Sequence, residues 1–266
     1  MPVRYPLATA NLIGVSQRRF RLLLTLPLAA LLAGCGATAR EAASQRPPAD
    51  APHCRTGLAP VGSKHVTLAA VVRSHARAYR RPGVRPFARF GRLNQNGFPT
   101  VFRVVSALRA QNCTARWYRV QLPIKPNGVT GYVRATAVET ERVRSRVVVD
   151  VSARRLSLYR HGRLVLRTRV AVGSPATPTP IGRYYVNQRL IPQDTAGPFG
   201  PAAIGISAYS DVLTGWAQGG PIAIHGTNEP WLIGHAVSNG CIRVRNPVLR
   251  RLFKVTPAGT PVTILR

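Results

Sequence analysis

Acidic residues are scarce in this sequence. The chain of 266 residues has 8 aspartates and glutamates against 38 lysines and arginines, which gives a formal net charge of +30. A charge of this size predicts anionic surroundings, such as anionic lipid, an acidic polymer or nucleic acid. Lysine is also scarce, since only Lys64, Lys125 and Lys254 occur, so arginine supplies nearly all of the positive charge.

Long apolar runs are missing as well. No run reaches the roughly 18 to 20 residues of a membrane-spanning helix, which excludes a polytopic membrane protein. Hydrophobic residues nevertheless make up 45% of the chain and charged residues 17%. That balance excludes a disordered chain, because a sizeable core can be buried. The length suffices for one large domain or two small ones.

The N-terminus has the pattern of an export signal. Three arginines between positions 18 and 21 precede a short apolar run, residues 22–32. The segment Leu32-Ala33-Gly34-Cys35 resembles a bacterial lipobox, which implies lipid transfer to Cys35 and removal of residues 1–34 as a signal peptide. A plain signal peptide that happens to contain a cysteine is the alternative. We expect a protein exported and lipid-anchored at the outer face of the cytoplasmic membrane, facing the cell wall, which disfavours nucleic acid as a partner.

Four cysteines have to be assigned. Cys35 is the expected lipid site, and the exported compartment permits disulfides. A bond between Cys54 and Cys113 would close a loop of about 60 residues and stabilise the fold by roughly 4 kcal/mol. Two free structural cysteines are the alternative. Cys241 is then left over, and an odd thiol in an exported protein requires an explanation.

Composition divides the chain into segments. Residues 35–53 are rich in alanine, proline and serine, which predicts a lipidated linker. Residues 54–142 carry short β-branched and aromatic runs between turn residues, which predicts a small β-barrel. Their patterns W-Y-x-V-x-L at 117–122 and G-Y-V at 131–133 resemble bacterial SH3-like domains, and this resemblance implies binding of the wall or of protein. A purely structural β-domain is the alternative.

Residues 143–266 also favour a mainly β architecture, because strands and helices do not alternate. Arg160-His161-Gly162-Arg163 predicts a hairpin turn between two strands. Residues 221–224 predict a strand that leads into His225. Residues 247–253 predict a short helix whose first residue is a proline, which is tolerated in a first turn.

Two segments of this region carry the parts of a thiol acyl-transfer site. His225 ends an apolar strand, and Ser238-Asn239-Gly240-Cys241 supplies a thiol preceded by a glycine. A thiol with a pKa of about 8.5 is mostly protonated near pH 7, and a nearby imidazole can convert it to the thiolate. Backbone N–H groups around the glycine could stabilise an oxyanion. Spacing alone does not establish that the two side chains meet.

His225-Gly226-Thr227-Asn228, followed by the segment from Ser238 to Arg243, resembles the L,D-transpeptidase catalytic domain of the YkuD type. The resemblance covers residues 146–266. It implies a β-rich catalytic domain with short helices, so the expected fold is mainly β, with an SH3-like barrel followed by this domain. It also implies a cysteine-dependent acyltransferase that acts on peptidoglycan stem peptides and reacts with carbapenem-type inhibitors.

The resemblance assigns the chemistry to two residues. Cys241 matches the nucleophile, which forms a thioester with a tetrapeptide stem as the terminal D-alanine leaves. His225 matches the base or imidazolium partner, which keeps Cys241 ionised and moves protons. An amine of a second stem then attacks the thioester to give a 3→3 cross-link. If water replaces the amine, the enzyme is an L,D-carboxypeptidase, and the sequence does not separate the two.

The resemblance also assigns supporting roles. The backbone of Asn239-Gly240-Cys241 is expected to hold the oxyanion, and Ser238 to orient this loop. Gly226 and Arg243 are expected at the substrate, where Arg243 either holds a carboxylate or braces the loop. Asn239 departs from the His or Lys often found at its position in the family.

Other classes of function were weighed against this one. No metal or organic cofactor is implied, and a zinc site from His225, His235 and Cys241 lacks the usual ligand spacing and a fourth ligand. Asp194 and Glu229 are too isolated to form a catalytic pair. A non-catalytic wall-binding lipoprotein and a basic nucleic-acid binder remain as alternatives.

Overall fold

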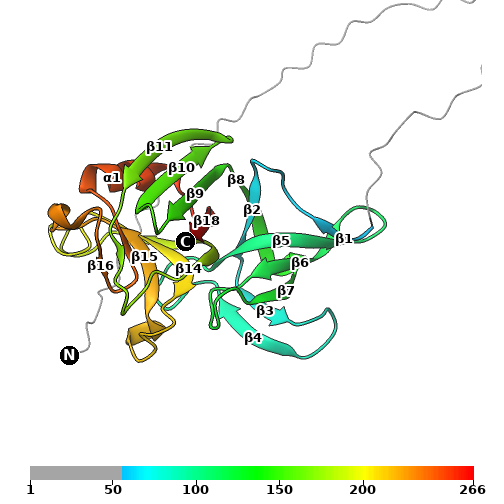
Figure 1. Ribbon diagram of the computed structural model, residues 1–266. Coiled ribbons are helices and arrows are strands. Elements are labelled where there is room, and N and C mark those ends of the chain that lie inside the picture. The colour runs from blue at the N-terminus through cyan, green and yellow to red at the C-terminus, as the bar shows by residue number, and fades with distance from the viewer. Residues whose placement is uncertain (1–55) are drawn as a thin grey trace, which may run out of the picture. The chain divides into compact units, whose positions relative to one another are not determined.

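A computed structural model describes residues 56–266 (Figure 1). The predicted signal peptide, the lipid site Cys35, the linker and Cys54 lie outside the described residues. Within residues 56–266, no helix is long and apolar enough to cross a membrane. This part of the chain is mainly β, as the sequence predicts, with two eight-stranded sheets and one two-stranded sheet.

The first sheet takes up residues 57–143 and is antiparallel throughout. Its strand order is β4-β3-β7-β6-β5-β2-β8, with β1 paired to β5. Its elements are β1 (Gly57–Pro60), β2 (Thr67–Val72), β3 (His75–Tyr79), β4 (Pro86–Gly91), β5 (Val101–Arg109), β6 (Ala115–Gln121), β7 (Thr130–Arg134), the 3-10 turn η1 (Ala135–Ala137) and β8 (Val138–Val143). Phe102, Val120 and Leu122 are buried in its core. The likeness to SH3-like domains stays a prediction.

Cys113 lies in the loop between β5 and β6 and takes part in a disulfide. Since Cys54 lies outside the described residues, the pairing of these two cysteines stays a prediction. Cys241 is a free cysteine.

The second sheet has the order β11-β10-β9-β18-β13-β14-β15-β17, and a separate small sheet pairs β12 with β16. Its pairs β9–β18 and β15–β17 are parallel. The elements are β9 (Ser145–Asp150), β10 (Arg155–Arg160), β11 (Arg163–Arg169), β12 (Val172–Gly173), β13 (Gly182–Leu190), β14 (Ala203–Tyr209), η2 (Ala217–Gly219), β15 (Pro221–His225), η3 (Pro230–Leu232), β16 (Ala236–Ser238), β17 (Ile242–Arg243), α1 (Asn246–Val255) and β18 (Pro261–Leu265).

Alternating side chains explain how the outer strands of the second sheet lie on the core. Val147 and Val149 of β9 are buried, as are Leu156 and Leu158 of β10, while the residues between them point away from the core. In the predicted hairpin, the turn between β10 and β11 places both central residues, 161 and 162, at positive φ, 51° and 81°. Positive φ at both positions matches the turn that suits the twist of paired strands.

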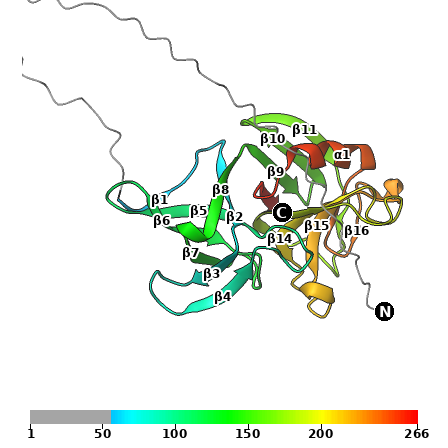
Figure 2. The ribbon, with the colours of Figure 1, turned by 180° about the vertical axis from the view of Figure 1, so that it is seen from behind.

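The centre of the second sheet positions the candidate site. Strand β14 lies between β13 and β15 and is buried over residues 203–208. Figure 2 shows β14 beside β15. Helix α1 begins one residue before the predicted helix, at Asn246, and buries Leu249 and Leu252 in the same core. It packs against β15, the strand that ends at His225.

Candidate active site

The parallel pair β15–β17 brings the predicted catalytic residues to one place. Its register aligns Ile224 with Ile242 and His225 with Arg243. Both isoleucines are buried in the core, so the alternate residues of these strands face the other side. Cys241 directly precedes β17 and lies beside Ala223, whose backbone hydrogen-bonds its thiol. The cysteine is partly exposed and shares a side of the sheet with His225.

The ring of His225 is fixed by a backbone carbonyl and an aromatic neighbour. The side chain is buried, with 4% of the residue exposed. Its Nδ1 lies 2.6 Å from the carbonyl oxygen of Gly226. A carbonyl only accepts hydrogen bonds, so Nδ1 carries the proton and Nε2 keeps a free lone pair in the neutral ring. The ring of Phe199 lies 4.9 Å from that of His225, centroid to centroid, at an angle of 59°.

Burial holds both members of the pair in their neutral forms. Burial, helped by the positive charge of Arg243, lowers the pKa of His225 to about 4, against the opposing hydrogen bond to Gly226. Burial raises the pKa of the Cys241 thiol above its ordinary value, although the Ala223 backbone and the charge of Arg243 act in the other direction. Of the two predicted roles of His225, base or imidazolium partner, these shifts favour the base, because burial disfavours the charged forms of both the imidazole and the thiol.

Ser238 forms two hydrogen bonds within the loop that carries Cys241, and its role as a loop support stays a prediction. Its Oγ donates to the carbonyl of Cys241 at 2.6 Å and accepts from the N–H of Gly240 at 3.2 Å. The Gly240 amide is thus engaged, which removes it from the three amides expected to hold an oxyanion. Asn239 between them is exposed.

The backbone angle and the close packing at Gly240 both exclude a side chain. Its φ of +103° lies in the region that favours glycine. A Cβ there would come within 2.9 Å of the Ile222 side chain. Its carbonyl accepts from the buried hydroxyl of Thr179 at 2.9 Å, and that hydroxyl in turn accepts from the N–H of Gly173 at 2.8 Å. Thr179 thereby links the cysteine loop to β12, a role that the sequence analysis did not assign.

Arg243 is held by a carboxylate of its own chain. Its Nη1 donates to Oε2 of Glu229 at 2.8 Å. Glu229 is in turn fixed through its N–H, which donates to the hydroxyl of Thr227 at 2.9 Å. Of the two predicted roles of Arg243, this contact fits the brace of the loop. Glu229 looked isolated in the sequence, because its partner Arg243 follows 14 residues later and is brought next to it only by folding.

Asn246 holds the backbone that follows His225. Its Oδ1 accepts from the N–H of Thr227 at 2.8 Å. The same oxygen lies 2.3 Å and 2.4 Å from where a Cβ would stand on Gly226 and Gly200. Gly226, expected at the substrate, therefore acts on His225 through its carbonyl and allows this close packing. Neither Asn246 nor Phe199 was given a role by the sequence, since nothing local marks their contacts.

In the described part of the chain, no three His, Cys, Asp or Glu side chains gather in a group that could hold a metal ion. His235, the third ligand of the zinc alternative, is exposed, and its carbonyl accepts from the N–H of Val172.

Residues 144–264 are similar to known proteins. Residues 144–264 match the family model of the YkuD L,D-transpeptidase catalytic domain. The chain is 36% identical over 120 residues to the putative L,D-transpeptidase YkuD of Bacillus subtilis, covering 45% of this chain and 65% of that protein. It is 31% identical over 165 residues to the probable L,D-transpeptidase ErfK/SrfK of Salmonella typhimurium, covering 55% of this chain and 52% of that protein.

The chain thus spans just under two thirds of the first relative and about half of the second. Among solved structures, an LD transpeptidase described as LdtMt1 in complex with imipenem is 15% identical, with a TM-score of 0.40 and coverage of 78% of this chain and 88% of that one. Residues 144–264 thus match the model of the YkuD L,D-transpeptidase catalytic domain and are similar in sequence to these two relatives.

Proposed function

We propose that the protein is a peptidoglycan L,D-transpeptidase that forms 3→3 cross-links through a thioester on Cys241. The observation that carries the proposal is the parallel pairing of β15 with β17, which aligns His225 with Arg243, two residues after Cys241. The charge of Arg243 lowers the pKa of both, which supports their belonging to one cluster. The lone pair of Nε2, left free by the bond of Nδ1 to Gly226, supplies the base that a thiol nucleophile needs.

In the proposed acylation, His225 acts as a general base. The sulfur of Cys241 attacks the carbonyl carbon of the third stem residue as Nε2 takes the thiol proton. The tetrahedral intermediate collapses by breaking the bond to the terminal D-alanine, whose amine receives that proton from the imidazolium. A neutral resting pair suits this sequence, because the imidazole is free to accept the proton when the S–C bond forms.

The oxyanion of that intermediate is assigned to the amides of Asn239 and Cys241. The N–H of Gly240 is already bound to Ser238, and its carbonyl to Thr179. These two bonds fix the peptide planes of the loop before the substrate binds. Donors fixed in advance stabilise a developing charge without the cost of reorganisation.

In the second half of the reaction, an amine of another stem attacks the thioester and passes its proton to His225, which returns it to the sulfur. Water in place of the amine gives the carboxypeptidase, so the products decide between the two. Purified protein incubated with disaccharide-tetrapeptides should yield a cross-linked dimer. Tripeptide without any dimer would replace the proposal by the carboxypeptidase.

The proposal is tested at its first covalent step by intact mass spectrometry with a carbapenem. The wild-type protein should gain the mass of one inhibitor, and Cys241→Ala should gain none. His225→Ala should slow the adduct by about 10²–10⁴-fold, the usual contribution of a general base. His235→Ala is the matched control, because this exposed histidine lies in the same connection and should leave the rate unchanged. An adduct on Cys241→Ala, or equal rates for wild type and His225→Ala, would contradict the proposed pair.

Export and lipid attachment at Cys35 complete the proposal and rest on the sequence alone. They would hold the enzyme at the outer face of the cytoplasmic membrane, next to its substrate. Cys35→Ser should move the protein from the membrane fraction to the soluble exported fraction. An unchanged membrane fraction with no lipid on wild-type protein would overturn the attachment.

A further inference from the structure

The segment that forms β9, β10 and β11 is rich in arginine. Residues 144–169 contain eight arginines and one acidic residue, Asp150. The three strands lie side by side at one edge of the second sheet, where β11 is the outermost strand (Figures 1 and 2). One side of these strands packs on the core, so the arginines of the opposite side have only solvent or a partner to face.

The register gathers three of the arginines on this side. Arg146 lies opposite Tyr159, and its guanidinium stacks 4.2 Å from the ring centroid. Arg155 of β10 and Arg167 of β11 belong to residue pairs two positions apart along these strands, so their side chains point to the same side of the sheet. We call Arg146, Arg155 and Arg167 the arginine face. Within residues 56–266, the ion pairs involve other arginines, Arg73 and Arg243.

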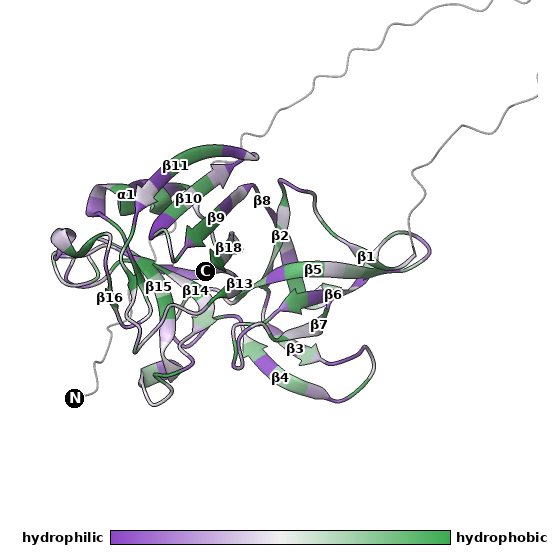
Figure 3. Cartoon of the chain, in the orientation of Figure 1, coloured by the Kyte–Doolittle hydropathy of each residue, from purple (hydrophilic) through white to green (hydrophobic). Residues whose placement is uncertain are grey.

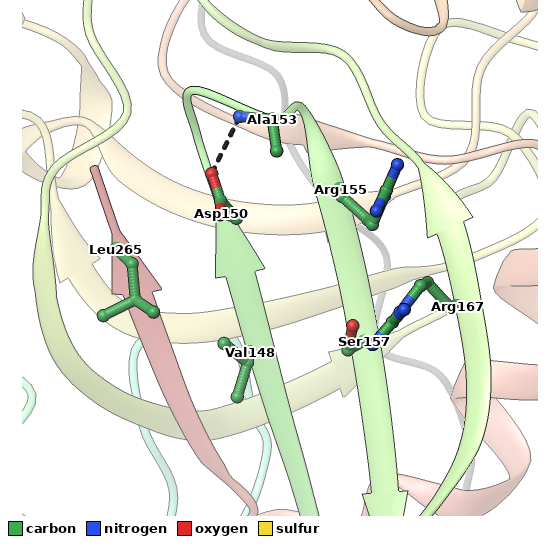
Figure 4. Close-up of a pocket in the computed structure, with 7 residues that line it drawn as sticks. All are labelled: Val148, Asp150, Ala153, Arg155, Ser157, Arg167 and Leu265. Carbon is green, nitrogen blue, oxygen red and sulfur yellow. Dashed lines mark hydrogen bonds between the residues drawn. The ribbon is translucent and has the colours of Figure 1, made fainter.

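The arginine face is hollowed. Arg155 and Arg167 line a cavity of about 200 Å³ together with Ser157, Asp150 and Leu265 (Figure 4). The carboxylate of Asp150 accepts from the N–H of Ala153 at 2.7 Å and from the hydroxyl of Ser152. The charge of Arg155 also lowers the pKa of Asp150, so this carboxylate offsets part of the positive charge of the hollow. Two guanidinium groups and a hydroxyl around a hollow of this size suit the oxygens of a phosphate group, to which guanidinium groups donate in pairs.

Exposed apolar side chains adjoin the arginines. The pairing of β10 with β11 shifts between Leu158 and Tyr159 and leaves Val165 of β11 without a partner residue, as in a β-bulge. The bulge leaves two consecutive residues, Leu164 and Val165, exposed by 45% and 54%. Figure 3 shows this apolar stretch of β11 between its hydrophilic ends. Charged residues alone would protect an edge strand from pairing, but exposed leucine and valine side chains do not serve that purpose.

We propose that the arginine face binds the surface of an anionic lipid bilayer. Its guanidinium groups bind lipid phosphates, while Leu164 and Val165 reach the boundary of the acyl chains. Basic residues combined with apolar side chains are typical of proteins that bind the membrane interface. Electrostatic attraction to anionic lipids and burial of apolar side chains both add to the affinity there. A dissolved anionic polymer would use the arginines alone. The proposal agrees with lipid attachment at Cys35 but does not require it, and it is independent of the chemistry at Cys241.

The test measures partition onto vesicles of phosphatidylcholine and phosphatidylglycerol at a ratio of about 7:3, against phosphatidylcholine alone. The full chain carries Cys35→Ser throughout, so no acyl chain contributes and the leader contributes equally in every variant. Replacing the three arginines of the face by glutamine should lower the affinity for anionic vesicles on the order of 100-fold, roughly fivefold for each arginine near the surface. Binding should also weaken as salt is raised.

The matched control replaces three exposed arginines by glutamine and removes the same net charge: Arg77 of β3, Arg89 of β4 and Arg81 of the turn between them. A smaller loss in this control, with normal carbapenem acylation in both triple variants, supports the arginine face. Equal losses in the two triple variants would overturn it. Leu164→Ser with Val165→Ser should also weaken binding, and an unchanged affinity there would assign the arginines to a soluble polyanion instead of a bilayer.

Discussion

The buried imidazole of His225 makes the stability of the protein depend on pH in a way that can be isolated. The folded state holds its pKa at about 4, against an ordinary value of 6.5 that applies to the unfolded chain. As the pH falls below about 6.5, the unfolded chain binds a proton that the folded state does not accept. Stability is therefore full above about pH 6.5 and falls steadily as the pH drops towards 4.

The size of the loss follows from the two pKa values. They differ by about 2.5, and each unit corresponds to about 1.4 kcal/mol. At pH 4, where the folded state is half protonated, the loss amounts to about 3 kcal/mol. This is a large part of the free energy of unfolding of an ordinary domain, about 5–15 kcal/mol.

The assay is urea unfolding of wild type and His225→Gln between pH 7.5 and 4. Glutamine does not titrate, and its amide can still donate to the Gly226 carbonyl. The carboxylates titrate alike in both proteins, so their contributions cancel in the difference. The stability of wild type relative to the variant should shrink by about 3 kcal/mol over this range. A difference that stays constant would show that His225 is not a buried neutral base and would refute the resting state on which the proposed mechanism depends.

Three further substitutions test the frame around the pair. Asn246→Ala leaves the N–H of Thr227 without its acceptor and should cost about 1–3 kcal/mol in urea unfolding and slow carbapenem acylation; Asn246→Asp, which keeps the acceptor, should restore most of both. Gly240→Ala places a Cβ at a φ of +103° and against a neighbouring isoleucine, so it should lower stability by about 1–3 kcal/mol and slow acylation. Acylation at the wild-type rate would show that the loop at Gly240 accommodates a side chain. Arg243→Gln removes a positive charge that lowers the pKa of Cys241, so the pH midpoint of thiol alkylation should rise. An unchanged midpoint would show that the charge of Arg243 does not act on the Cys241 thiol.

Local patterns in the sequence were sufficient for several elements. The turn at residues 160–163 and the helix that begins near Pro247 follow from signals within a few residues, and both are present. Strand β14 was not expected, because the segment 203–209 has no polar alternation and is buried on both sides between β13 and β15. A strand of that kind is recognised only once its neighbours are known.

The residue types of the proposed catalytic pair and their spacing were determined by the sequence alone, since a cysteine after glycine and a histidine at a strand end are local facts about Cys241 and His225. Their electrostatic state was decided by the tertiary structure, because burial sets it and burial depends on every segment that packs around them. The same holds for the partners Glu229 and Asn246, which lie 14 and 19 residues from the groups they bind. A hydrogen bond joins atoms that are close in space, and folding alone brings residues so far apart in the chain within its reach.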